Sequence, residues 1–170
     1  MTAGGWKKEF RKCLSEGNLP DLMPEVAALK GVPQPHEYHP EGDAFDHTVL
    51  AVEAVADEDD ERVFWAVLLH DIGKTRVTEF RDGRWRAHGH DRIGAEMAPA
   101  ILRRFGREAL VDDVCWLIRH HQYEMSWQLA PGQELTRRQK AFTEHILFPL
   151  LKRVCIADRA GRIAGQGSIN

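Results

Sequence analysis

The pattern of apolar and polar positions predicts helices along most of the chain. Apolar residues recur at helical spacing in segments that glycine and proline separate, and these two residues commonly end helices. We expect helices at about 6–15, 21–30, 44–56, 61–70, 92–105 and 108–121, and a last helical region over 136–160 that is interrupted near Pro149. The segments 33–42 and 122–135 are expected to be loops.

Two segments refine this prediction. Residues 61–70 are apolar on nearly all sides, which predicts a helix at the centre of a bundle. Residues 78–87 place Asp82-Gly83 between Phe80 and Trp85, which predicts a small β-hairpin. The expected fold class is therefore all-α, a helical bundle with at most one small β-hairpin at about 78–87, in a single domain over residues 1–170.

The composition is that of a globular protein. The 170 residues are 43% hydrophobic and 29% charged, enough apolar material for a packed core. No apolar run approaches the roughly 18 residues of a membrane helix, and the N-terminus lacks the apolar core of a signal peptide. The three cysteines, Cys13, Cys115 and Cys155, are far apart, which argues against disulfides and a thiolate zinc site. We therefore expect a cytoplasmic protein.

Charge is distributed unevenly, although the formal net charge is only −3. Ten acidic residues accompany one basic residue between Glu37 and Arg62, whereas nine basic residues accompany four acidic ones between Lys74 and Arg107. The acidic run 57–61 indicates a solvated helix start, because a nucleotidyltransferase D-x-D site needs a preceding Gly-Ser turn on a strand, and none precedes this run. The basic stretch is either ordinary surface charge or a rim that faces phosphate.

His70-Asp71 is the first candidate for chemistry. The dipeptide ends the most apolar helix, where a carboxylate is costly to bury without a cationic partner. A divalent metal shared by the imidazole and the carboxylate removes that cost. The alternative is a helix end with a stabilising histidine and a solvated aspartate.

Four other helices carry a histidine or an aspartate where their apolar faces turn inward. His47 lies on an apolar stripe of its helix, and His90 begins the next one after the hairpin. His120-His121 end a further apolar helix, and Asp158 lies near the end of the last. We therefore expect the imidazoles and carboxylates of five helices to meet in the interior.

The order His47, His70-Asp71, Asp158 resembles the H…HD…D signature of the HD-domain metal-dependent phosphohydrolases. The resemblance is closer still to the HD domain of bacterial tRNA nucleotidyltransferases (CCA-adding enzymes) and of HD-type RNA end-healing enzymes. The matching stretches are His39 to Asp43 with Asp46-His47-Thr48, Leu68 to Lys74, Gly89 to Ala95, and Ala157 to Arg162. The nucleotidyltransferase catalytic domain has no counterpart in the sequence, so we expect no CCA addition by this chain.

That resemblance implies a ligand set. His47, His70, Asp71 and Asp158 would hold one divalent ion, and His90 with His120 or His121 would hold a second, with Asp71 as the bridge. Of the adjacent pair we expect His120 to be the ligand and His121 to support a ligand or contact phosphate. The ions expected are Mn, Ni, Co, Fe, Zn or Mg. The remaining histidines (His36, His39, His88 and His145) are assigned to surface or loop positions, with His39 as the main exception because it lies in a matching stretch.

Catalytic and substrate-binding roles are assigned to a few further groups. Asp71 is expected at the reacting centre, His121 as a proton donor to the leaving oxygen, and Lys74 as a phosphate contact or a helix-end charge. Arg92 and Arg159 are expected to be phosphate contacts or ordinary surface arginines. The tryptophans are expected in the core, with base stacking by Trp85 or Trp127 as the alternative.

The resemblance implies a phosphohydrolase for nucleotides or RNA ends, of the 2′,3′-cyclic phosphodiesterase and 2′-phosphatase type. The alternatives are a 5′-nucleotidase or cyclic-nucleotide phosphodiesterase and, in another class, a non-catalytic RNA- or nucleotide-binding module. The expected substrate is a nucleotide or an RNA 2′,3′-phosphate end, with no membrane partner. The sequence contains no Gly-x-x-x-x-Gly-Lys loop, the phosphate-binding motif of an end-healing kinase. An end-healing kinase or ligase is therefore expected as a partner or a fused domain.

Overall fold

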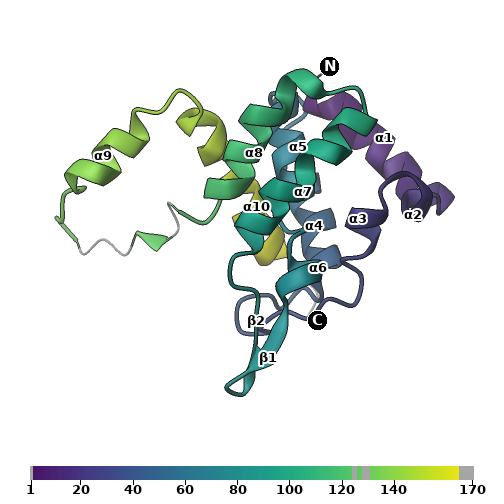
Figure 1. Ribbon diagram of the computed structural model, residues 1–170, viewed down its shortest axis with the longest axis horizontal. Coiled ribbons are helices and arrows are strands. Elements are labelled where there is room, and N and C mark those ends of the chain that lie inside the picture. The colour runs from purple at the N-terminus through teal and green to yellow at the C-terminus, as the bar shows by residue number, and fades with distance from the viewer. Residues whose placement is uncertain (1, 124–125, 128–130, 165–170) are drawn as a thin grey trace.

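Helix α5 (Glu61–Leu69) lies at the centre of a helical bundle in the computed structural model, which describes residues 2–123, 126–127 and 131–164 (Figure 1). Seven consecutive residues of α5, Val63 to Leu69, are buried. Asp60 caps this helix by accepting a hydrogen bond from the Arg62 backbone N–H at 2.8 Å. The predictions of a central helix at 61–70 and of a solvated helix start at 57–61 are both confirmed. A helix that is apolar on all sides is most stable when other helices surround it.

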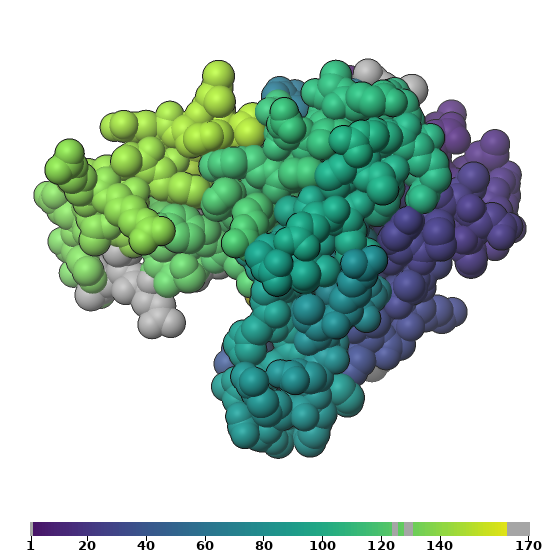
Figure 2. Space-filling view, viewed as in Figure 1, coloured from purple at the N-terminus to yellow at the C-terminus, as the bar shows by residue number. Residues whose placement is uncertain are grey.

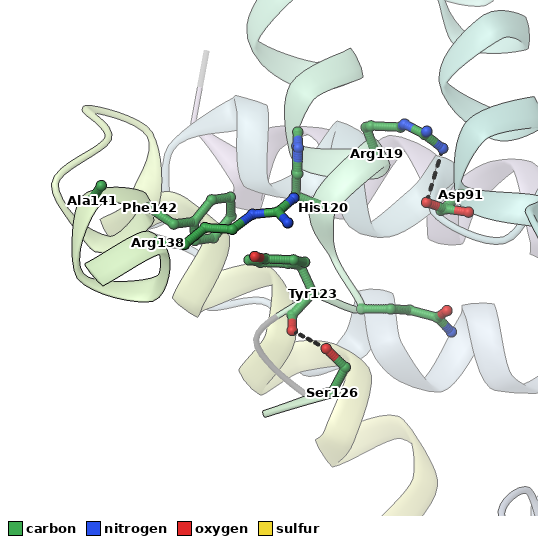
Figure 3. A pocket seen from close by; sticks show the side chains of 9 residues that line it. Asp91, Arg119, His120, Tyr123, Ser126, Arg138, Ala141 and Phe142 are labelled. Carbon is green, nitrogen blue, oxygen red and sulfur yellow. Dashed lines mark hydrogen bonds and ion pairs between the residues drawn. The ribbon is translucent and has the colours of Figure 1, made fainter. Parts of the chain in front are cut away.

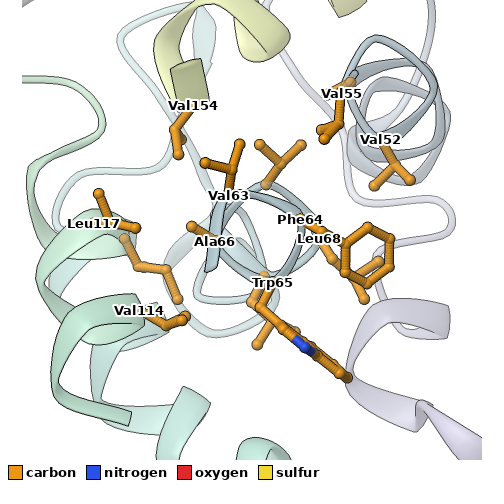
Figure 4. Packing of buried hydrophobic residues seen from close by; sticks show 14 of the residues in the cluster. Val52, Val55, Val63, Phe64, Trp65, Ala66, Leu68, Val114, Leu117 and Val154 are labelled. Carbon is orange, nitrogen blue, oxygen red and sulfur yellow. The ribbon is translucent and has the colours of Figure 1, made fainter. Parts of the chain in front are cut away.

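The other elements wrap around α5. Before it come α1 (Ala3–Glu16), α2 (Leu19–Leu22), α3 (Pro24–Ala27) and α4 (Ala44–Glu53); after it come α6 (Lys74–Val77), β1 (Glu79–Arg81), β2 (Arg84–Arg86), α7 (His90–Arg104), the 3₁₀ helix η1 (Glu108–Leu110), α8 (Val111–His120), α9 (Arg137–Thr143) and α10 (Phe148–Ala164). Helices α1, α4, α8 and α10 pack directly on α5, α7 lies along α8, and α10 lies along α4. Figure 4 shows Val52, Val114, Leu117 and Val154 directed at α5 from three of these helices.

The all-α fold class is confirmed. Strands β1 and β2 form an antiparallel pair in which Phe80 faces Trp85, as expected for a hairpin turning at Asp82-Gly83. The hairpin projects from the bundle in both views (Figures 1 and 2). No helix in the described ranges is long and apolar enough to cross a membrane.

Several boundaries differ from the sequence prediction. The helix expected over 21–30 is instead two short helices, α2 and α3, because Pro24 begins a new helix at its first position. The last helical region breaks at 144–147 rather than at Pro149, which lies in the first turn of α10, where its missing N–H costs nothing. Helix α6 was not expected, and part of the expected loop 122–135 lies outside the described residues.

Candidate metal centre

Five helices, or the residues directly after them, bring their polar side chains to a single buried cluster. His47 comes from α4, Asp158 from α10, His90 from the first residue of α7, and His70-Asp71 and His121 from the residues that follow α5 and α8. All six of these side chains are buried. We call this group the polar cluster.

Three of its imidazoles are oriented in the same way. The Nδ1 atoms of His70, His90 and His121 each lie 2.6–2.7 Å from a backbone carbonyl oxygen, those of Val67, Ala87 and Ile118. A carbonyl oxygen only accepts, so Nδ1 carries the proton and Nε2 is left with a free lone pair. The three rings therefore present electron-pair donors to the interior of the cluster.

The Nε2 lone pairs of these three imidazoles are buried together and would be stabilised by a cation. His90 Nε2 and His121 Nε2 are 3.3 Å apart, and neither has a proton to donate to the other when Nδ1 is protonated. Among the described residues, His70 Nε2 is buried without a hydrogen-bond partner. A buried polar atom without a partner costs free energy unless another group satisfies it. A metal ion beside His70, and another between His90 and His121, would satisfy these atoms.

Asp71 lies between these donors. Its Oδ1 is 3.3 Å from His90 Nε2, and its Oδ2 is 3.3 Å from His70 Nε2 and 2.8 Å from Lys74 Nζ. Burial opposes the charged carboxylate, but nearby positive charge, of which the Lys74 ammonium is the permanent source, outweighs burial and holds the pKa of Asp71 well below its ordinary value. Asp71 is therefore an anion at the centre of the cluster.

His47 and Asp158 form the second part. His47 Nε2 lies 2.9 Å from Asp158 Oδ1, and His47 Nδ1 donates to Glu41 Oε1 at 2.7 Å. Burial lowers the pKa of His47, but its hydrogen bonds to Asp158 and Glu41 outweigh burial and raise it to about 9. The Glu41 pKa falls to about 2, since the hydrogen bonds from His47 and His39 outweigh burial. Glu41 thus orients His47 as a carboxylate commonly orients a metal-binding histidine.

The donor atoms group as metal sites do. Within each of two sets, His47–His70–Asp71 and Asp71–His90–His121, the potential ligand atoms lie within 4.8 Å of one another. Asp71 belongs to both, so it is placed to bridge two ions. The donors are imidazole nitrogens and carboxylate oxygens, a combination that suits first-row transition metals and zinc. The residues present therefore fit a divalent metal centre of one or two ions.

Two close backbone contacts hold the ligand-bearing elements together. A Cβ at Gly73 would lie 2.1 Å from the His90 carbonyl oxygen, so the start of α6 can touch α7 only without a side chain there. A Cβ at Gly161 would lie 3.0 Å from the backbone nitrogen of Ala51, at the contact of α10 with α4. The two glycines lie two or three residues from Asp71 and Asp158, so they set the spacing of the ligand pairs.

A surface cavity adjoins the polar cluster at His90 and Lys74. This cavity of about 230 Å³ is lined by Lys74, His39 and His90, among others. Lys74 Nζ donates to Asp71 and, at 2.6 Å, to Gln34 Oε1. An ammonium has three N–H donors, so one remains for a ligand in the cavity.

His121, rather than His120, joins the polar cluster, which reverses the expected order of the pair. His120 instead lies half-buried beside a separate cavity of about 680 Å³, with Tyr123, Phe142 and Arg138 around it (Figure 3). The ring centroids of His120 and Trp116 are 4.5 Å apart. The Nδ1 atom of His120 lies 2.8 Å from the backbone carbonyl oxygen of Trp116. Helical spacing carries the signal that was missed: Val114, Leu117, Ile118 and His121 occupy one buried stripe at i, i+3, i+4 and i+7.

The expected arginines lie elsewhere. Arg92 is exposed and forms an ion pair with Glu96 at 2.8 Å, and Arg159 is exposed. The arginine beside Asp158 is instead Arg162, whose Nη2 lies 3.1 and 3.2 Å from the two carboxylate oxygens. Its i, i+4 spacing from Asp158 on α10 was the available signal.

Loop residues account for the other omissions. Glu41 and Gln34 follow no helical period, so nothing in the pattern indicated that they contact His47 and Lys74. Of the four histidines assigned to surface or loop positions, His39 was expected to be the main exception. It is buried, and its Nδ1 lies 2.9 Å from Glu41 Oε1. His36, His88 and His145 are exposed.

Comparison with known proteins identifies the family of the chain. The HD domain family matches residues 38–162. Similar curated proteins include the Multifunctional CCA proteins of Alkalilimnicola ehrlichii (33% identical over 165 residues, 91% of this chain and 38% of the relative) and Neisseria meningitidis serogroup C (37% over 164 residues, 91% and 37%). That of Halorhodospira halophila is 34% identical over 157 residues, 89% of this chain and 37% of the relative. The chain spans less than two-fifths of the length of these relatives, and no solved structure matches it. The resemblance seen in the sequence is confirmed: the chain belongs to the HD domain family.

Proposed function

We propose that the chain is a metal-dependent phosphohydrolase that acts on the phosphate of a nucleotide or an RNA end. The observation that carries the proposal is the convergence of three unprotonated Nε2 atoms on the Asp71 carboxylate, next to an opening lined by Lys74. A buried site of this kind is built for a cation and, through the cation, for an anionic substrate.

The metal ligands we propose are His47, His70, Asp71, His90, His121 and Asp158. When bound, a divalent ion supplies Lewis acidity at the phosphoryl oxygens and makes water a competent nucleophile near neutral pH. The chain's own residues fix this arrangement: backbone carbonyls orient three of the imidazoles, and Glu41 orients His47.

Lys74 is the residue that we assign to the substrate. Its ammonium is held by Asp71 and Gln34 and lines the cavity through which a phosphate would enter. A cation fixed in a water-poor site stabilises charge that develops on phosphoryl oxygens in the transition state. Lys74 would therefore act on the substrate, whereas Asp71 holds both the lysine and the ligands in place.

The geometry does not favour His121 as the proton donor. Burial, with His70 and His90 nearby, lowers its pKa to about 3, and its Nδ1 proton is directed at a backbone carbonyl. A neutral imidazole with that arrangement donates no proton to a leaving group but is well suited to coordinate a metal. We therefore propose His121 as a ligand.

The preferred substrate class is the 2′,3′-cyclic phosphate or 2′-phosphate of an RNA end. The support is the similarity over most of this chain to proteins named Multifunctional CCA protein, together with the cavity lined by Lys74 beside the polar cluster. In the first reaction water opens the cyclic diester to a monoester, and in the second it releases inorganic phosphate.

The test is product analysis with the full chain, stripped of metal by chelator and then resupplied singly with Mn²⁺, Ni²⁺, Co²⁺, Zn²⁺ or Mg²⁺. The substrates are a nucleoside 2′,3′-cyclic phosphate, the 2′- and 3′-monophosphates, and a 5′-deoxynucleotide. We expect opening of the cyclic phosphate and release of the 2′-phosphate only when metal is restored. Cleavage confined to the 5′-nucleotide would favour a nucleotidase, and metal binding without any cleavage would favour a binding module.

A further inference from the structure

The β1–β2 hairpin and the loop beside it expose aromatic side chains that a stable bundle has no need to expose. Tyr38 is 57% exposed, Phe80 61% and Trp85 38%. Among the described residues, these are half of the six large hydrophobic side chains that are exposed. Clustering of this kind, rather than scattering, marks a surface that binds something.

The exposed aromatics are arranged with cations. A surface hollow of about 300 Å³ is lined by Tyr38, Trp85, Arg84, Arg86 and His88, with Pro35. Phe80 supports Trp85 from the opposite strand, with ring centroids 5.2 Å apart at an interplanar angle of 66°. We call these seven residues the hairpin surface.

One guanidinium of the hairpin surface is uncommitted. Arg86 pairs with Asp82 at 3.4 Å, and Arg81, which faces Arg84 across the strand pair, pairs with Glu79 at 3.3 Å. Arg84 is exposed, and no carboxylate of the described residues lies within ion-pair distance of it. An arginine without an acidic partner beside an exposed indole is available to bind phosphate.

The hairpin surface continues into the opening of the polar cluster. Pro35 and His88 line both the hollow at Trp85 and the cavity that holds Lys74, His39 and His90. A chain that places its terminal phosphate at Lys74 would therefore have its preceding nucleotides over the hairpin. Figure 2 shows how far the hairpin stands out from the body of the molecule.

We propose that the hairpin surface binds the single-stranded RNA that leads into the cavity, with a base stacked on Trp85 or Tyr38 and a phosphate on Arg84. This inference rests on the proposed function and specifies its substrate as an oligonucleotide end rather than a free mononucleotide. Aromatic faces interleaved with arginines are the usual means of binding single strands without sequence preference, because every base has a π-face.

The binding test is independent of catalysis. A fluorescein-labelled 12-nucleotide single-stranded RNA with a 3′-hydroxyl end is titrated with the full chain in chelator, and fluorescence anisotropy gives Kd. We expect Trp85→Ala to raise Kd by about 5- to 150-fold, the range for loss of one stacked base, and Trp85→Phe to restore most of the affinity. Arg84→Ala should lower the slope of log Kd against log salt by about 0.7, the value for one single-strand phosphate contact.

Two matched controls lie away from the hairpin surface. Ile146→Ala removes a side chain that is 87% exposed, and Arg103→Ala removes an exposed arginine in the last turn of α7. Arg103 lies about 20 Å along α7 from His90, at 1.5 Å per residue. Both variants should bind the RNA as the wild type does. Circular dichroism checks that all variants keep the helical fold.

A second readout addresses the substrate. kcat/KM is measured for an RNA oligonucleotide ending in a 2′,3′-cyclic phosphate and for the corresponding mononucleotide. The ratio of the oligonucleotide value to the mononucleotide value should be lower in Trp85→Ala than in the wild type, because KM for the oligonucleotide rises. Equal RNA affinity in the wild type and Trp85→Ala, or no RNA binding by the wild type, would overturn the inference. If RNA binds through Trp85 but no phosphate ester is cleaved, the proposed function fails and the binding surface stands.

Discussion

His120 and His121 are neighbours in the chain, yet the fold gives them opposite surroundings. Each ring is tied by Nδ1 to a backbone carbonyl of its own helix, at 2.8 Å for His120 and 2.7 Å for His121. His121 then presents Nε2 to His90 in the polar cluster. His120 instead packs among Trp116, Tyr123 and Phe142, in what we call the aromatic group.

The difference shows that the position of a histidine on its helix, and not the residue type alone, makes it a candidate metal ligand. One residue along a helix is a rotation of about 100°, which takes a side chain from the buried stripe to the neighbouring face. On the buried stripe the facing helices supply Asp71 and His90, and on the other face α9 and the residues after it supply rings such as Phe142 and His145. The same imidazole is therefore a proposed metal ligand in one place and a packing group in the other.

The most drastic way to break this comparison is to neutralise the centre of the polar cluster. In Asp71→Asn we expect hydrolysis to fall to the detection limit and metal to be lost, because the charge shared by both ligand sets is removed. Asparagine preserves the shape and keeps an oxygen that accepts a hydrogen bond from the buried Lys74, whereas Asp71→Ala would remove this acceptor as well as the charge. Metal content by mass spectrometry and turnover measure the effect; normal metal content would refute the site.

The next largest effect is expected at Lys74. Lys74→Met fills a similar volume without the charge, so metal should be retained while kcat/KM falls by about 10- to 1000-fold. The measurement is steady-state turnover alongside metal content. Unchanged kcat/KM would mean that Lys74 only balances the charge of Asp71.

The histidine pair allows a matched comparison. His121→Gln should weaken metal binding by about 10- to 100-fold, whereas His120→Gln should leave the metal affinity at the wild-type value. Titration of the stripped protein with a competing chromophoric chelator measures both affinities. Equal loss of metal affinity in His121→Gln and His120→Gln would contradict the distinction between the polar cluster and the aromatic group.

The smallest effect on the metal centre is expected from the aromatic group itself. The Trp116 ring stacks on His145 at 4.0 Å between centroids and contacts His120 and Phe142. Trp116→Ala should lower the free energy of unfolding by about 1–3 kcal/mol, because it removes part-buried ring contacts. Urea unfolding measures the change, and metal content per folded molecule should stay at the wild-type value.

Much of the fold followed from local pattern. The all-round apolar segment at Val63–Leu69, the helix start at the acidic run 57–61, and the Asp82-Gly83 turn are short-range signals, and the structure confirms them. Helix boundaries failed where proline acted as a helix start rather than a stop, at Pro24 and Pro149.

The polar cluster could be predicted where helical period aims a side chain inward, as for His47, His70 and Asp158. It could not be predicted where a loop supplies the partner. Glu41 and Gln34 reach His47 and Lys74 through the path of the segment 28–43, which is set by tertiary packing and leaves no periodic trace. Arg162 and His121 were recoverable from spacing alone, and a stricter count of i+4 and i+7 positions would have selected them.

The glycine contacts have a consequence for ion size. Gly161 lets α10 touch α4 one turn from Asp158 and His47, and a methyl group there would force the helices apart by about a few tenths of an ångström. Preferred oxygen–metal distances differ by a similar amount, at about 2.0–2.1 Å for Mg²⁺ and about 2.3–2.6 Å for Ca²⁺. Because close contacts at positions 73 and 161 hold the elements that carry the proposed ligands, we expect Gly161→Ala to change the relative affinities for ions of different radius.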